Sequence, residues 1–276
     1  MLRQRATPYP HWEFTHPTLG DQLRLLPERG GLVSGWRCAG REVLYLDVER
    51  LADPALSVRG GIPVLFPICG GLPPERSGLA QHGFARDQAW SLTALDEGDG
   101  VLLELADSPE TLAVYPHPFR LRMAVQLQPG ALAIALQVLN PGSAPLPFCF
   151  GLHPYFAVSS LDAVHLEGLP PQVIDQTTLA PAERDSLLDA LPQGIDLLAE
   201  PRDCVRLQDR GWGTEVSLET TAPLDLAVLW TDPPRPMVCL EPWTAPRGAL
   251  LSGERLLVVE PGASLTLRTR FGVHTR

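Results

Sequence analysis

The segment from Phe119 to Leu139 constrains the fold more than any other part of the chain. From Leu121 to Leu127 apolar residues alternate with polar or small ones, which is the period of a strand with one buried face. Pro129-Gly130 forms a turn, and Ala131 to Leu139 returns as a nearly continuous apolar strand, as expected where both faces are covered. The pattern predicts two antiparallel strands joined by a tight turn.

Short apolar runs of the same kind recur along the chain. The 29 prolines and 24 glycines provide turns at the short intervals that an antiparallel sandwich needs. A hairpin is expected from Gly31 to Asp47 around Ala39-Gly40, and the clearest helical pattern, Ala182 to Leu191, is short. Further strand candidates are residues 101–105, 163–166, 204–207, 214–220, 224–229, 237–240, 256–259 and 264–271. We expect an all-β protein, a large antiparallel β-sandwich with few short helices that forms one domain over residues 1–276.

The charge balance excludes several classes of partner and chemistry. The formal net charge of −10 argues against binding to nucleic acid or to an anionic membrane surface. All 22 basic residues are arginine, so Schiff-base chemistry, pyridoxal phosphate attachment and a P-loop lysine are excluded. An anionic substrate would need a local cationic pocket of its own.

No apolar stretch reaches the roughly 20 residues of a membrane helix. The segment Met1 to Pro8 is too polar for a secretory signal, so a cytoplasmic location is expected. The five cysteines are scattered, with no CxxC pair, and are interpreted as small buried thiols. We expect a monomer or a weak homodimer.

Three short polar motifs stand out against the apolar background. The first runs from Arg59-Gly60-Gly61-Ile62-Pro63 to Gln81-His82-Gly83-Phe84-Ala85-Arg86, within a segment (Gly60 to Ala89) too long for a simple connection. The second is Gly151 to Phe156, and the third is Cys239 to Trp243. Together they contribute two histidines, one carboxylate and two arginines, a set that can move protons on a sugar and hold an anion without a cofactor.

Two of these ionisable residues precede a proline. The backbone of His153 is therefore expected to be extended. Glu241 follows the apolar run Val238-Cys239-Leu240, and a carboxylate at such a strand end, beside Trp243, is partly desolvated and suited to act as a general base. A structural histidine and an exposed strand-end glutamate remain the alternatives, and His82 is open to a similar structural interpretation.

Taken together, the motifs resemble those of the aldose 1-epimerase (mutarotase) superfamily, in particular its glucose-6-phosphate 1-epimerase-like branch. The resemblance runs from Gly30 onward. It rests on R-G-G-I-P…F-P at 59–67, H-G-F-A-R…W at 82–90, H-x-Y-F at 153–156 and V-C-x-E-P-W at 238–243, with further likeness at 246–250 and 257–262. It implies the large β-supersandwich of these enzymes and the interconversion of the α and β anomers of an aldohexose or a hexose 6-phosphate.

The resemblance also implies a role for each matching residue. Glu241 matches the general base, His153 the general acid, and His82 a second histidine that binds the sugar near its ring oxygen. The family has a substrate-binding aspartate, usually followed by arginine; the nearest match is Asp203, with Cys204 in place of the arginine, and Asp232 is the other candidate.

Arg59 and Arg86 match positions that the sugar-phosphate branch associates with an anion, and guanidinium groups bind phosphate bidentately. Their alternative role is to pair with acidic loop residues such as Asp53, Glu75 or Asp87. A neutral aldose such as glucose or galactose is the alternative substrate.

Other functions are weaker alternatives. A non-catalytic carbohydrate-binding or regulatory protein on the same fold would not need both His153 and Glu241. A zinc site of His82, His153 and Glu241 lacks the HExxH-type spacing, and a serine hydrolase lacks the GxSxG motif. We expect no metal and no cofactor.

Overall fold

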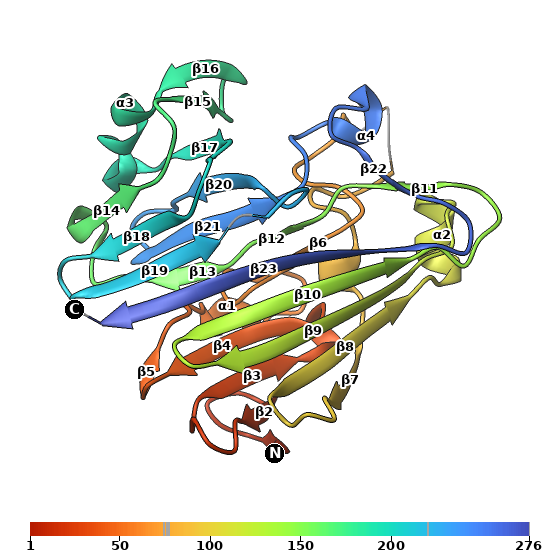
Figure 1. Cartoon of the computed structure of the whole chain (residues 1–276), viewed down its shortest axis with the longest axis horizontal. Coiled ribbons are helices and arrows are strands. Elements are labelled where there is room, and N and C mark those ends of the chain that lie inside the picture. The colour runs from red at the N-terminus through yellow and green to blue at the C-terminus, as the bar shows by residue number, and fades with distance from the viewer. Residues whose placement is uncertain (74, 76–77, 220, 276) are drawn as a thin grey trace.

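The computed structural model describes residues 1–73, 75, 78–219 and 221–275. Three main sheets account for most of its strands, and every pairing between named strands is antiparallel (Figure 1). The N-terminal sheet has the order β1 (Leu2–Arg5), β2 (His11–Thr15), β3 (Gln22–Leu26), β4 (Leu32–Cys38) and β5 (Arg41–Glu42).

Two larger sheets form the sandwich. The first has the order β14 (Val164–Glu167), β18 (Val205–Asp209), β19 (Thr214–Glu219), β23 (Ser264–Thr275), β10 (Ala131–Leu139), β9 (Arg120–Gln128), β8 (Gly100–Ala106) and β7 (Ser91–Ala94). The second has the order β16 (Ala180–Glu183), β15 (Gln172–Asp175), β17 (Asp196–Ala199), β20 (Leu226–Trp230), β21 (Met237–Trp243), β12 (Gly151–Leu152) and β6 (Val64–Leu65), and β13 (Tyr155–Ala157) also pairs with β21.

The remaining elements are short. In the described part of the chain, the pair β11 (Leu146–Phe148) and β22 (Leu257–Val259) forms a small separate sheet. The α-helices are α1 (Val48–Leu51), α2 (Pro109–Val114), α3 (Arg184–Leu188) and α4 (Ala249–Ser252), and the 3₁₀ turns are η1 (Pro27–Arg29), η3 (Ala85–Asp87), η4 (Leu161–Ala163) and η5 (Leu191–Gln193). No helix among the described residues has the length and apolarity needed to cross a bilayer.

The central core lies between the two large sheets. The ring of Phe156 on β13 meets the ring of Phe271 on β23, with centroids 5.5 Å apart. Leu121, Met123 and Val125 on β9 are buried in this core, so the alternation in the sequence correctly predicted the inward face of the strand. The β9–β10 hairpin is in register from Gln128 opposite Ala131, as the Pro129-Gly130 turn predicted.

The strands of the second large sheet divide their side chains between two faces. On β21, Val238 and Leu240 belong to the central core, whereas Cys239 and Trp243 pack in separate clusters on the opposite face. The same division places Leu197, Ala227, Leu229, Leu152 and Phe156 in the core, and Leu198, Val228, Trp230 and Tyr155 outside it. This outer face carries the polar motifs.

Three local predictions need correction. Only residues 184–188 of the predicted 182–191 helix form α3, because Ala182 and Glu183 pair with β15 as part of β16. The 60–89 segment is not a bare loop, since it contains β6 and η3; residues 74, 76 and 77 lie outside the described part. The strand predicted for 237–240 continues to Trp243, so Glu241 lies within β21 rather than at its end.

Cysteine placement agrees with the sequence analysis for four of the five residues. Cys38, Cys69, Cys149 and Cys239 are buried free thiols, and Cys204 is half-buried.

The turn at His82-Gly83 yields a prediction about stability. Gly83 has φ +72°, and a Cβ atom there would lie 2.1 Å from the carbonyl oxygen of Phe66. We expect Gly83→Ala to lower the thermal unfolding midpoint much more than Gly40→Ala does. A Cβ atom added at Gly40 (φ +82°) would have no atom within 4 Å, so this variant incurs only the cost of a left-handed backbone conformation, about 1–2 kcal/mol. If the two variants lowered the unfolding midpoint equally in a melting experiment, the backbone of Phe66 would not be held rigidly against Gly83.

Candidate active site

The three polar motifs become neighbours through strand pairing. Both β12 and β13 pair with β21, with Gly151 opposite Trp243 and Tyr155 opposite Cys239. The register relative to β21 is therefore the same on both sides of the break between β12 and β13. Midway between these pairs, His153 falls opposite Glu241. Directly opposed residues on one face have Cβ atoms about 4.5–5.5 Å apart. The register thus brings together two residues separated by almost ninety positions.

The first motif borders the second on its other side. The backbone N–H of His153 donates to the carbonyl of Pro63 at 3.0 Å, and that of Tyr155 donates to the carbonyl of Gly61 at 2.9 Å. The Gly-Gly-Ile-Pro segment therefore holds the extended backbone that the proline after His153 predicted.

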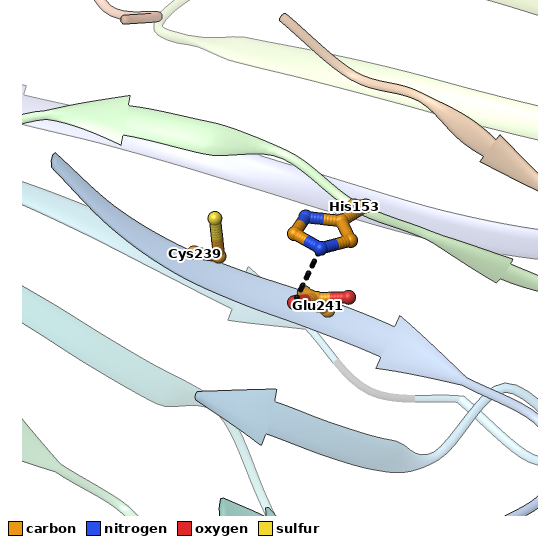
Figure 2. Close-up of side chains that lie close together, drawn as sticks. All are labelled: His153, Cys239 and Glu241. Atoms are coloured by element: carbon orange, nitrogen blue, oxygen red, sulfur yellow. Dashed lines mark ion pairs between the residues drawn. The ribbon is translucent and has the colours of Figure 1, made fainter. Parts of the chain in front are cut away.

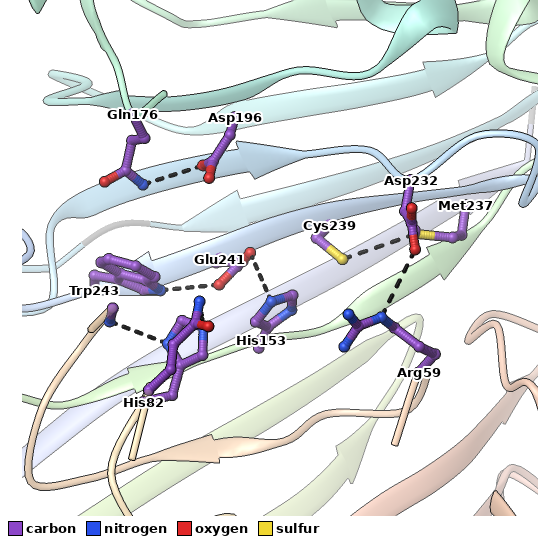
Figure 3. Close-up of polar contacts among 12 residues, drawn as sticks. Arg59, His82, His153, Gln176, Asp196, Asp232, Met237, Cys239, Glu241 and Trp243 are labelled. Carbon is purple, nitrogen blue, oxygen red and sulfur yellow. Dashed lines mark hydrogen bonds and ion pairs between the residues drawn. The ribbon is translucent and has the colours of Figure 1, made fainter. Parts of the chain in front are cut away.

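The central contact is between an imidazole and a carboxyl group. His153 Nε2 lies 3.3 Å from Glu241 Oε1, and the indole Nε1–H of Trp243 donates to Glu241 Oε2 at 3.0 Å (Figure 3). Glu241 is only 1% exposed and His153 8% exposed. Both oxygens of the carboxyl group are thereby fixed in position.

Aromatic rings fix the plane of the His153 imidazole. It stacks on Tyr155 with centroids 4.8 Å apart and planes inclined by 12°, and Trp230 meets it edge-on at 5.7 Å. The Nδ1 atom of His153 is buried and has no hydrogen-bond partner in the described part of the chain. The ring is therefore oriented by packing, and its Nε2 faces Glu241.

Burial favours the uncharged forms of both groups. Desolvation raises the pKa of Glu241 well above its usual value, against the hydrogen bond from Trp243, which lowers it. Desolvation lowers the pKa of His153 to about 3, and the positive charges of Arg86 and Arg59 lower it further. Burial accordingly favours a protonated Glu241 beside a neutral imidazole.

His82 lies next to this pair in a strained turn. Its φ is +68°, and its ring centroid is 5.6 Å from that of His153 and 5.8 Å from that of Trp243. Its Nδ1 accepts a hydrogen bond from the backbone N–H of Gly70 at 3.0 Å. Burial lowers the pKa of His82 well below its usual value, with a smaller contribution from His153. Neutral His82 thus carries its proton on Nε2, as a donor.

A cavity of about 160 Å³ opens at these side chains. Five of the six predicted site residues line it: Arg59, His82, Arg86, His153 and Glu241. The other described residues of its wall are Ser57, Gln81, Tyr155, Asp196, Val228, Trp230, Trp243 and Arg247. Larger cavities lie beside it, sharing Arg86 or Arg247, but the histidines and Glu241 converge only on this one among the described cavities.

The two predicted arginines approach the cavity from loops. Arg59 lies 3.7 Å from Asp232 Oδ2, and its guanidinium lies 5.6 Å from the centre of the Trp230 ring. Arg86 donates to the carbonyl of Gln81 at 2.8 Å, and its Nε, 4.0 Å from Asp87, has no hydrogen-bond partner in the described chain. Arg59 and Arg86 therefore each line the cavity and lie close to an aspartate, Asp232 and Asp87 respectively.

An aspartate and a third arginine in the wall were not predicted. Asp196, at the start of β17, pairs with Arg247 and accepts a hydrogen bond from Gln176 at 3.2 Å. Burial raises the pKa of Asp196, and Arg247 opposes that shift. The signals were a carboxylate opening an apolar strand and an arginine in the Pro246-to-Leu250 segment, but nothing local indicated that the two converge.

Neither of the two aspartates proposed for the substrate lines the cavity. Asp203 is exposed in the segment just before β18, a strand of the other large sheet. Asp232 pairs with Arg59 and with Arg235, the latter at 2.8 Å. The aspartate that does line the cavity is Asp196.

The zinc site considered in the sequence analysis, formed by His82, His153 and Glu241, does not match the cluster of donor atoms in the structure. Among the described residues, the donor atoms that lie within 4.8 Å of one another belong to His153, Cys239 and Glu241. His82 is not in this group, and its Nδ1 is already engaged by Gly70.

Comparisons with known proteins identify the family of the chain. The aldose 1-epimerase family model matches residues 25–272. The chain is 31% identical over 202 residues to "Putative glucose-6-phosphate 1-epimerase" of Escherichia coli (strain K12), covering 70% of this chain and 65% of that protein. A protein with the same printed name from Cenchrus ciliaris is 33% identical over 154 residues, which is 51% of this chain and 45% of that protein.

The aligned regions thus span about half to two thirds of the curated relatives. Among solved structures, the Slr1438 protein from Synechocystis sp. PCC 6803 has a TM-score of 0.89 and 34% identity, covering 100% of this chain and 96% of that one. A galactose mutarotase related enzyme from Lactobacillus acidophilus, at 22% identity and a TM-score of 0.78, shares the fold. With a family match over residues 25–272, the chain belongs to the aldose 1-epimerase family.

Proposed function

We propose that the protein is a mutarotase that interconverts the α and β anomers of a hexose 6-phosphate by general acid–base ring opening and closure. The observation that carries the proposal is the contact of His153 Nε2 with Glu241 Oε1 at 3.3 Å, at the wall of a cavity lined by three arginines. The family membership of the chain and the names of its relatives agree with it.

The reaction needs a pair of groups that shares one proton. In ring opening, Glu241 takes the proton of the C1 hydroxyl while His153 protonates the ring oxygen, and the C1–O5 bond breaks. The aldehyde then rotates about the C1–C2 bond, and the two residues exchange roles as the ring closes on the other face. Each positioned proton-transfer group contributes about 10²–10⁴-fold to the rate.

The forms that burial favours correspond to the arrangement needed for closure. A protonated Glu241 returns a proton to the C1 oxygen, and a neutral His153 accepts one from the C5 hydroxyl. The arrangement needed for opening differs by the transfer of one proton from Glu241 Oε1 to His153 Nε2, and the two atoms are in direct contact. Polar sugar hydroxyls in the cavity stabilise the charged form of the pair relative to the desolvated one.

Further wall residues are placed to orient the sugar. The Nε2–H of His82 is a donor for an oxygen near the ring, and Asp196 is an acceptor for hydroxyl groups on the β17 side. Trp230 and Trp243 offer apolar ring surface beside the pair. Binding through these groups reduces the freedom of the substrate before proton transfer.

The arginines favour a phosphorylated sugar. Arg59, Arg86 and Arg247 line one small cavity in a chain with a formal net charge of −10, so they form the local cationic pocket that an anion requires. Arg86 lines the cavity, and its buried Nε–H has no hydrogen-bond partner in the described part of the chain. Guanidinium donors match phosphate oxygens in pairs.

The alternative is a carbohydrate-binding or regulatory protein without catalysis. Such a protein gains nothing from a buried carboxyl group in contact with a buried imidazole, and burying both carries a desolvation cost. The His153–Glu241 contact therefore favours the enzyme.

The acid–base pair gives the first prediction. Glu241→Gln and His153→Ala should each slow anomer exchange of glucose 6-phosphate by about 10²–10⁴-fold, since each removes one proton-transfer group. Two-dimensional exchange NMR measures the rate, and a melting curve confirms folding. Exchange at the wild-type rate in either folded variant, on every sugar tested, would exclude the mechanism.

The two aspartates make a matched comparison. Asp196→Asn should reduce kcat/KM by roughly tenfold or more, because it removes a charged acceptor in the cavity wall and the partner of Arg247. Asp203→Asn, in the exposed segment before β18, should leave kcat/KM within about twofold. The reverse ranking would restore Asp203 as the substrate aspartate.

Substrate charge can be tested with the arginines. Arg59→Gln and Arg86→Gln should lower kcat/KM for glucose 6-phosphate by roughly 10- to 100-fold and for glucose far less, as a charged hydrogen bond contributes about 1.5–3 kcal/mol. Arg235→Gln is the control, since Arg235 pairs with Asp232 and Asp47 and is not part of the described cavity wall. Equal losses for both sugars would refute phosphate recognition.

A further inference from the structure

The Cys239 thiol lies beside the His153–Glu241 pair and has no part in the proposed reaction. Cys239 and Glu241 are two positions apart on β21, so their side chains leave the same face of the strand. Figure 2 shows the sulfur, the imidazole and the carboxyl group gathered on this face. One donor atom from each of the three residues lies within 4.8 Å of the other two.

This donor set suits one class of ion. Zn²⁺ binds imidazole nitrogen, thiolate sulfur and carboxylate oxygen, and three protein ligands leave a fourth position open. Tetrahedral bonds of about 2.0–2.3 Å place donor atoms roughly 3.3–3.8 Å apart. The His153 Nε2 to Glu241 Oε1 distance of 3.3 Å already meets that spacing. The thiol sulfur lies within 4.8 Å of the other two donor atoms, so it has to move closer to them before all three bind one ion.

The ion has a route to these donors and a suitable surrounding. His153 and Glu241 line the 160 Å³ cavity, so an ion that enters with the solvent meets them first. Cys239 lies behind them, fully buried, with its Sγ 3.9 Å from Met237 Sδ, which makes this end of the site rich in soft sulfur donors.

We propose that Zn²⁺ binds to His153, Cys239 and Glu241 as an inhibitor that competes with the sugar. The thiol proton and the proton held by the Glu241 carboxyl group both leave to solvent as the Zn–S and Zn–O bonds form, and the neutral imidazole binds without losing a proton. A bound ion occupies the imidazole nitrogen and the carboxyl oxygen that would transfer protons, so the same site either processes a sugar or holds the metal. Binding itself does not depend on the proposed function; only the inhibition does.

Metal binding is tested directly on untagged, chelator-treated protein. Calorimetric titration with Zn²⁺ should give one equivalent bound to the wild type and at least tenfold weaker binding to Cys239→Ala, since removing even an outer partner of a ligand costs 10- to 100-fold. Cys204→Ala and Cys149→Ala are the matched controls, one half-buried and one buried thiol, and should bind as the wild type does. Unchanged binding by Cys239→Ala would overturn the proposal.

A second measurement avoids any doubt about folding of the variant. Co²⁺ added to the wild type should produce the near-ultraviolet charge-transfer band of a thiolate–cobalt bond, and saturating glucose 6-phosphate should abolish it. A cobalt complex without the thiolate band would rule out Cys239 as a ligand.

The effect on turnover separates the two proposals. Micromolar Zn²⁺ should reduce the rate of anomer exchange by the wild type at least tenfold, and a chelator should restore that rate. The same Zn²⁺ concentration should inhibit Cys239→Ala much less, relative to the activity of this variant without metal. If the thiolate band forms but no sugar is epimerised with or without metal, the proposed function fails and the metal site stands. If epimerisation proceeds and zinc does not bind through Cys239, the metal site fails alone.

Discussion

The direct cross-strand contact of His153 with Glu241 is the constraint on which the rest of the site depends. It follows from a register that is identical on both sides of a break in the neighbouring strand. Pro154 and Pro242, which follow the two residues, cannot donate to the ladder, so the sheet loses regular hydrogen bonding where the two side chains meet. The Gly61–Pro63 segment compensates by accepting the N–H groups of His153 and Tyr155.

The face of the sheet on which the pair lies explains its electrostatics. Alternate residues of these strands point into the central core, and the others point to an outer face that carries His153 and Glu241. Aromatic rings and the loops that carry Arg59 and His82 cover this outer face. The closure is nearly complete, and the resulting desolvation favours the neutral forms of both groups. Burial costs folding free energy, and under the proposed mechanism it favours the proton arrangement from which the ring closes.

Much of the fold and part of the site could be predicted from the sequence because they are encoded locally. Alternation predicted β9 and its turn, and the short polar motifs, together with the family resemblance, pointed to His82, His153, Glu241, Arg59 and Arg86, which line one cavity. Asp196 could not be found in this way. It reaches the cavity because β17 pairs with β20 and β20 with β21, a relation between strands that no local pattern records.

The same limit explains the remaining differences. The end of the strand at Leu240 was placed too early because Pro242 and a charged residue normally interrupt a strand, whereas here the adjacent strand is broken at the matching point. Residues 182 and 183 have a helical sequence pattern, but they form a strand because β16 pairs with β15. In both cases a partner strand, distant in sequence, decided the local structure.

In the proposed mechanism, reaction chemistry and substrate choice are carried by separable parts of this architecture. The proposed proton-transfer pair lies on β21 and at the junction of β12 and β13, whereas the guanidinium groups come from the segments before β6, at η3 and after β21. Loops accept insertions, deletions and exchanges that a paired strand does not, because a one-residue slip would reverse every side chain of β21. A lineage built on this scaffold is accordingly free to diversify which sugars it accepts while inheriting one unaltered way of opening them.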